Sequence, residues 1–113
     1  MKIIDGTITL DDLKRMAIDG FGNMVKAVVD VELEVMAVDG ELHADEEALL
    51  LQNGSRQSNL WGINIYPDLG MPDRIEFDSM INIRPSQGNR SRGVDDPEIR
   101  EKIVQIIQKL ITS

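Results

Sequence analysis

The sequence predicts an α+β fold, a four-stranded antiparallel meander with an N-terminal and a C-terminal helix on one face. One segment near each end of the chain has the apolar spacing of an amphipathic helix. Between them, apolar and polar residues alternate over several short stretches, which is typical of strands with one buried face. A chain of 113 residues is the usual size of one domain, so residues 1–113 are expected to form a single unit.

The first helix is expected over residues 10–19. Thr9 is a suitable N-cap with Asp12 three residues later, and Gly20 is typical of the position just after a helix. Residues 2–8, which precede this helix, are a candidate for a short edge strand.

The apolar period changes after this helix. Every odd position over residues 25–37 is apolar, which predicts a strand, and Asp39-Gly40 is a strong signal for a two-residue hairpin turn. Residues 41–51 are ambiguous, because their second half could also form two turns of helix. We expect a strand there, since a tight turn leads directly into it and "QNG" follows as another turn signal.

Two further strands and the second helix complete the prediction. The stretch "LWGINIYP" alternates with Trp61 on its apolar face, so Trp61 is expected in the core. "RIEFDSMINIRP" alternates in the same way from Ile75 to Ile83. The last helix begins with Asp96 as N-cap and Pro97 at its first position, and isoleucines and leucines then form one continuous apolar face.

The composition excludes several classes of protein. The chain has no cysteine, so it forms neither disulfides nor thiolate metal sites. The formal net charge of -8 disfavours broad binding to nucleic acid, which depends on many phosphate contacts. We see no signal peptide and no apolar run near 18 residues, so we expect a cytoplasmic protein without a membrane span.

A histidine and several acids fall together in the expected hairpin. If Asp39-Gly40 forms its turn, His43, Asp45 and Glu47 share one face of the sheet, while Glu46 lies on the core side without a partner. An imidazole with carboxylates suits a divalent metal such as Mg²⁺, Mn²⁺ or Zn²⁺. The alternative is that these three residues simply lie on a solvated acidic face of the sheet, because their spacing in the sequence matches no recognised set of metal ligands.

An arginine-rich loop, residues 84–92, follows the last expected strand. Three arginines alternate there with small polar side chains, and arginine binds phosphate and carboxylate through paired hydrogen bonds. The loop is therefore a candidate anion site, although its arginines could instead neutralise the acidic sheet face. The candidate ligand-binding residues are Arg84, Ser86, Gln87, Asn89, Arg90, Ser91 and Arg92.

Three stretches resemble a small prokaryotic protein family known only as a domain of unknown function. They are "VVDVELEVMAVDGELHADEEALLL", "NLWGINIYP" and "INIRPSQGNRSRGVDDPEIR", and the likeness extends from about Leu10 to the end of the chain. The resemblance implies a bacterial or archaeal origin and one stand-alone domain. It implies no activity, so no functional residue is carried over.

Three functions fit these features. The first is a small binding domain in which the loop 84–92 lies beside the segment 43–47 and binds a polar or anionic ligand or a partner protein. The second is a metal-dependent hydrolase or phosphoryl-processing enzyme that uses the same residues. The third is a structural or regulatory homodimer.

Overall fold

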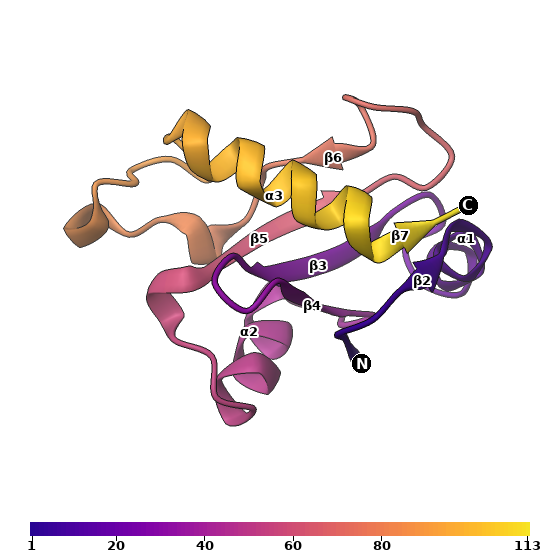
Figure 1. Cartoon of the computed structure of the whole chain (residues 1–113), viewed down its shortest axis with the longest axis horizontal. Coiled ribbons are helices and arrows are strands. Elements are labelled where there is room, and N and C mark those ends of the chain that lie inside the picture. Colours follow the sequence, from indigo (N-terminus) through magenta and orange to yellow (C-terminus); the bar gives the residue numbers. More distant parts are fainter.

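The computed structural model describes all 113 residues and has an α+β fold built on a five-stranded antiparallel sheet. The spatial order of the strands is β1-β4-β3-β5-β6, and a separate parallel pair, β2 and β7, lies beside the C-terminal end of α3 (Figure 1). The elements are β1 (Lys2–Ile4), β2 (Ile8–Thr9), α1 (Leu10–Asp19), β3 (Val25–Asp30), β4 (Val35–Val38), α2 (His43–Gln52), β5 (Leu60–Ile65), β6 (Ile75–Glu76), α3 (Pro97–Leu110) and β7 (Ile111–Thr112).

The two predicted helices are confirmed, and their caps are the expected ones. The Thr9 hydroxyl accepts a hydrogen bond from the Asp12 amide at 3.1 Å, so α1 begins at Leu10. Asp96 caps α3 in the same way, and Pro97 occupies its first turn. The predicted edge strand is β1, which pairs with β4. No helix in the structure is both long enough and apolar enough to cross a lipid bilayer.

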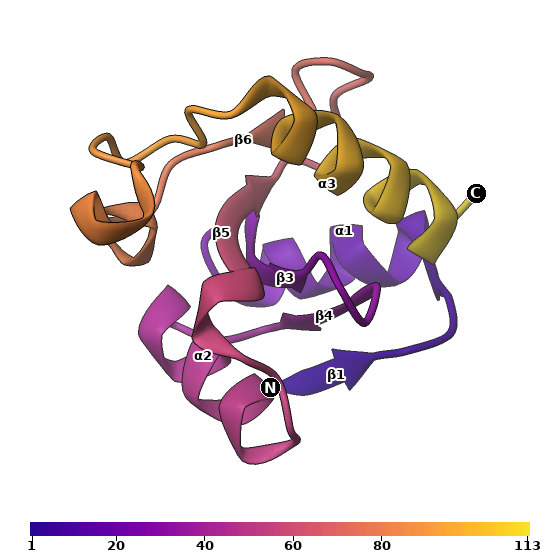
Figure 2. The ribbon, with the colours of Figure 1, turned by 60° about the vertical axis from the view of Figure 1, so that its left-hand side comes forward.

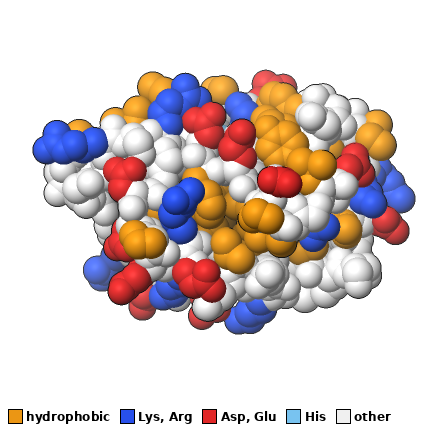
Figure 3. All heavy atoms as spheres, turned by 90° about the horizontal axis from the view of Figure 1, so that it is seen from above, with side chains coloured by type: hydrophobic (Ala, Val, Ile, Leu, Met, Phe, Trp, Pro, Cys, Tyr) orange, Lys and Arg blue, Asp and Glu red, His pale blue; other side chains and the backbone are white.

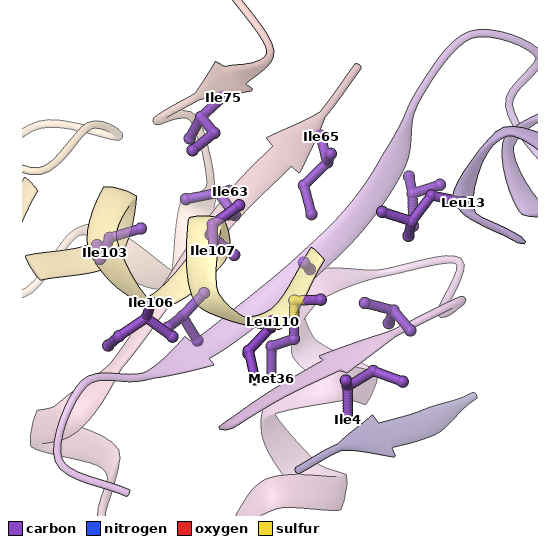
Figure 4. Packing of buried hydrophobic residues seen from close by; sticks show 14 of the residues in the cluster. Ile4, Leu13, Met36, Ile63, Ile65, Ile75, Ile103, Ile106, Ile107 and Leu110 are labelled. Atoms are coloured by element: carbon purple, nitrogen blue, oxygen red, sulfur yellow. The ribbon is translucent and has the colours of Figure 1, made fainter. Parts of the chain in front are cut away.

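The main core lies between the sheet and the helices α1 and α3. Figure 4 shows Ile103, Ile106 and Ile107 of α3 directed at the sheet, and Leu13 of α1 farther away in another part of the same cluster. Trp61 belongs to this cluster of 18 buried residues, as predicted. The apolar stripe of each helix is thus explained by burial against one side of the sheet.

The predicted strand over residues 25–37 is wrong in its length, because the chain reverses inside it. The Asp30 carboxylate accepts hydrogen bonds from the amides of Glu32 and Leu33, both at 2.9 Å. Glu34 adopts a φ of 57°, and β4 then pairs antiparallel with β3. The hairpin turn is therefore residues 31–34 and not Asp39-Gly40, where β4 has already ended.

Residues 41–51, expected as a strand, are mostly helix α2. The segment is rich in alanine, leucine and glutamate, which are strong helix formers, and its apolar residues do not alternate. Its buried residues His43, Glu46 and Leu50 are three and four positions apart, so they lie on one helical face. The Asp39-Gly40 turn signal precedes a helix here instead of joining two strands.

The sheet is not a four-stranded meander, and its helices do not all lie on one face. Both β4 and β5 pair antiparallel with β3, so they are parallel to each other and need a crossover connection. Helix α2 makes that crossover, and Figure 2 shows it on the side of the sheet opposite α3. A second cluster of Val28, Ala37, Leu50 and Leu60 fills the space beneath it.

The last predicted strand stops after two residues. β6 covers only Ile75–Glu76, and residues 80–82 form a turn of 3₁₀-helix capped by the Ser79 hydroxyl. Asn82 satisfies the β5 edge with its side chain: its Oδ1 accepts from the Gly62 amide at 2.8 Å, and its Nδ2 donates to the Gly62 carbonyl at 3.0 Å. A side-chain amide thus replaces the backbone of a neighbouring strand.

Candidate functional site

Arg84 begins the arginine-rich loop, but its side chain is directed into the protein. The residue is 9% exposed, and its guanidinium donates to the carbonyls of Gln57 and Leu60. Its guanidinium carbon lies 4.1 Å from the centroid of the Trp61 ring. Burial lowers the pKa of Arg84, and the charge of Glu47 opposes that shift. These contacts give Arg84 a structural role.

The middle of the loop is held by its own hydrogen bonds. Buried Asn89 donates from Nδ2 to the carbonyls of Asn82, Ser91 and Gly93, and its Oδ1 accepts from the amide of Asp95. The Ser91 hydroxyl donates to the Asp95 carboxylate, a bond that lowers the pKa of this acid. Asn89 and Ser91 are therefore already engaged within the loop.

The four remaining candidates of the loop are exposed and differ in their contacts. Ser86 and Arg90 make no side-chain hydrogen bond, and Gln87 reaches the carbonyl of Ser58 at 3.4 Å. Arg92 forms an ion pair with Asp78, with 2.7 Å between Nε and Oδ1. The loop thus forms one ion pair with an acid, and both of its partners are open to solvent.

Helix α2 separates the three predicted metal ligands. His43 is buried, Asp45 is exposed, and Glu47 is half-buried with its Oε2 lacking a partner. Burial raises the pKa of Glu47, and the positive charge of Arg84 opposes the shift. Positions 43 and 47 are one helical turn apart, but position 45 lies on the other side. No group of three or more His, Asp or Glu side chains that could hold a metal ion is present.

His43 and Arg92, one from each predicted segment, do come together at one groove of about 360 Å³. Its floor is formed by Lys26 of β3 and Asn64 of β5, which are register partners on the α2 side of the sheet. The start of α2 forms one wall and residues 78–81 form the other. We call this the His43 groove, and its lining residues are Met24, Lys26, Leu42, His43, Ala44, Asn64, Asp78, Ser79, Met80, Ile81 and Arg92.

The ring of His43 is held in one tautomer. Its Nε2 lies 2.8 Å from the carbonyl oxygen of Ile63, which only accepts, so the proton is on Nε2. Nδ1 then carries a lone pair, and the side chain of Asn64 lies close enough to the ring to act on its pKa. Burial lowers the pKa of His43, and Lys26 adds to that effect, while the Ile63 carbonyl, Asp78 and Asn64 oppose it. The neutral ring therefore presents a basic nitrogen.

Asn64 provides a free acceptor in the floor of the groove. The residue is 6% exposed, and its Nδ2 donates to Glu76 Oε1 at 2.8 Å, which fixes the orientation of the amide. Its Oδ1 is buried and has no partner. A buried polar atom without a partner is costly, so a donor supplied by a ligand would be favourable here.

The groove also offers positive charge. Lys26 and Arg92 line it, and the N-terminus of α2 has no side-chain cap, because Leu42 occupies the N-cap position. Unpaired amides at a helix start favour a negative group. Against this, Asp78 lies close by in its pair with Arg92. Chemically, the groove can accept hydrogen bonds from a donor and bind an anionic group at the same time.

Sequence analysis missed Lys26, Asn64 and Asp78. Each occupies a polar position of an alternating stretch, a position where a side chain ordinarily faces solvent. The signal for Asn64 lay in "WGINI", where a small and an amide residue replace the usual surface charges on the polar face. Their convergence depends on α2 crossing over that face, which the alternation does not reveal.

Glu46 lies under the start of α2, outside the groove. It is fully buried, its Oε2 accepts from the Gly40 amide at 2.9 Å, and its Oε1 has no partner. Burial raises its pKa to about 9, an effect that the Gly40 hydrogen bond partly offsets. The lone acid that the sequence placed on the core side is thus a neutral carboxylic acid in the folded chain.

The fold and the groove define a small α+β protein whose crossover helix covers part of a polar sheet face. A family model described as "Protein of unknown function (DUF5674)" matches residues 2–110, and the chain belongs to this family. The comparisons found no match among curated proteins and none among solved structures.

Proposed function

We propose that the protein binds a small polar anion in the His43 groove, an organic acid or phosphate ester that also carries a hydroxyl or amino group. One observation carries the proposal. His43 and Asn64 are both at least nine-tenths buried, Asn64 Oδ1 has no hydrogen-bond partner, and both residues line the groove with the cations Lys26 and Arg92. The anionic group would contact the cations, and the donor would reach His43 Nδ1 or Asn64 Oδ1.

A thermal melt followed by the fluorescence of Trp61 tests this function. The panel contains inorganic phosphate, hydroxy acids, amino acids and nucleotides at constant ionic strength. A ligand at a hundred times its dissociation constant adds about 2.7 kcal/mol to the free energy of unfolding. For a chain of this length the midpoint should rise by several degrees.

Two matched variants decide whether the groove is responsible. Lys26→Met keeps the aliphatic length of the side chain and removes the charge, so the ligand-induced shift should disappear. Arg90→Met removes a loop arginine that does not line the groove, so the shift should remain. An equal shift in Lys26→Met and the unmodified protein would show that the ligand binds elsewhere.

A hydrolytic activity is the second candidate, favoured by the neutral His43 with a lone pair on Nδ1. A base of this kind can take a proton from water or from a substrate hydroxyl. His43→Gln should abolish turnover of a phosphate or carboxylate ester by the purified protein. The metal-dependent form of this reaction has weaker support, since α2 separates His43, Asp45 and Glu47.

The homodimer stays a separate prediction. It is tested by the molar mass in solution over a range of protein concentrations. A mass that doubles with concentration would favour it over a monomeric binding domain.

A further inference from the structure

A second groove, of about 620 Å³, lies next to the His43 groove at the end of the sheet where β3 begins. It runs between the C-terminal end of α1 and the segment that joins β4 to α2. We call it the Phe21 groove. The two grooves share Met24, Lys26 and Leu42, but all other residues that line them differ.

The Phe21 groove exposes large apolar side chains that the fold does not use. Phe21 is 48% exposed and Leu42 is 56% exposed. Neither side chain, nor that of Met24 between them, belongs to or packs against either hydrophobic cluster of the protein. Apolar surface that gathers at a groove and is left open to water is typical of an interaction site.

The rim of this groove is acidic. Asp19, Asp39 and Glu41 line it, and Lys26 is its single cation. The ammonium of Lys26 lies 4.9 Å from the centroid of the Phe21 ring. Three carboxylates against one ammonium leave an excess of negative charge around an apolar floor, so the complementary surface carries positive charge.

We propose that the Phe21 groove binds a segment of a partner protein in which one or two large apolar side chains are flanked by lysine or arginine. The apolar side chains would contact Phe21 and Leu42, and the basic ones would face the carboxylates of the rim. A second copy of this chain fits less well, because a symmetric contact would bring two acidic rims together. The proposal does not depend on the function assigned to the His43 groove.

Selection from a library of random 12-residue peptides displayed on phage tests this proposal with the intact protein as bait. Enriched peptides should combine aromatic or aliphatic residues with lysine or arginine. Two or three of them, made synthetically with a fluorescent label, are then titrated with the protein by anisotropy. Phe21→Ser and the double variant Asp39→Asn/Glu41→Lys should each weaken binding at least tenfold, and added salt should weaken it further.

Matched controls distinguish binding in the Phe21 groove from non-specific hydrophobic binding and from binding caused by the overall negative charge of the chain. Ile18→Ser removes an apolar side chain of α1 that is 73% exposed and does not line the groove, so binding should persist. Glu98→Gln/Glu101→Lys makes the same change of charge on α3 and should also leave binding intact.

Three results would overturn the proposal: no enrichment, enrichment of acidic peptides, or equal binding by Phe21→Ser and the unmodified protein. A melt of each variant verifies that the fold is kept. His43→Gln alters only the other groove, so peptide binding and ligand binding can fail independently.

Discussion

Arg84 covers the indole of Trp61, with 4.1 Å between the guanidinium carbon and the ring centroid, while its nitrogens bond to the carbonyls of Gln57 and Leu60. One arginine therefore joins the loop 84–92 to the start of β5 and to the segment before it. The first residue of a loop that resembles an anion site is thus a structural residue, and only Arg92 lines the His43 groove.

Replacement of Arg84 should lower stability without any ligand being present. Arg84→Ala removes two charge-assisted hydrogen bonds and leaves two carbonyls without their donor, so we expect a loss of about 2–4 kcal/mol. Arg84→Lys should recover only part of this, because an ammonium lacks the planar fork that reaches both carbonyls. Chemical denaturation measures the change.

Arg90→Ala is the control for Arg84. The side chain of Arg90 is exposed, so the effect should stay within about 0.5 kcal/mol. Equal losses at both positions would contradict a special role for Arg84.

Gly62 should not tolerate a side chain, because a Cβ atom there would lie 2.5 Å from the Cβ of Ser79. Gly62→Ala should cost about 1–3 kcal/mol through overpacking. Ser79→Gly in the same chain should restore part of the loss, and a double-mutant cycle measures that coupling. Gly6→Ala, where nothing lies within 4 Å of the added atom, is the neutral comparison.

The neutral acid Glu46 should make stability depend on pH. Its folded pKa of about 9 lies above its ordinary value of 4.5, so the folded state keeps a proton that the unfolded state loses between these limits. The protonated Glu46 contributes fully to the free energy of unfolding below pH 4.5. This contribution is lost as the pH rises towards 9, by at most about 1.4 kcal/mol per pH unit.

Glu46→Gln should remove most of this slope and raise stability at pH 8, because the amide can still accept from the Gly40 amide. Urea denaturation at several pH values gives the slope, with Glu101→Gln on the exposed face of α3 for comparison. A slope unchanged by Glu46→Gln would mean that Glu46 is ionised in the folded protein.

Asp30 should be essential for the turn that joins β3 and β4. It is fully buried, and besides the amides of Glu32 and Leu33 it accepts the Ser55 hydroxyl at 2.6 Å. Asp30→Ala should cost about 2–4 kcal/mol, since three donors lose their acceptor. Ser55→Ala removes one of the three bonds and should cost about 1 kcal/mol. Both losses are measurable by denaturation, and equal values would contradict this account.

The face of the folded protein seen in Figure 3 has no broad basic area, as the negative net charge of the sequence leads us to expect. Figure 3 shows acidic and basic side chains interspersed with apolar ones on the face seen from above. No single-signed basic area is visible on this face, which fits the net charge of -8. Binding of charged groups in the two grooves would therefore depend on the few charged side chains that line each groove.

The sequence by itself determined the helices α1 and α3, the edge strand β1 and the burial of Trp61. Each depends on local signals: Thr9 and Asp96 bond to amides two or three residues away, and a helical apolar stripe must find a surface to cover. Such signals act within a few residues, so they can be recognised without the fold.

The tertiary structure alone decided the path of α2 across the sheet and the groove, while the turn at 31–34 has a local cause that the alternation conceals. Asp30 captures two amides of its own turn and so ends β3 early, after which the apolar side changes from odd to even positions. Helix α2 then has to cross over β3 to reach β5, and this crossover brings His43 to Asn64 and Arg92. Residues so distant in sequence share no local pattern, because their proximity results from strand pairing and not from spacing.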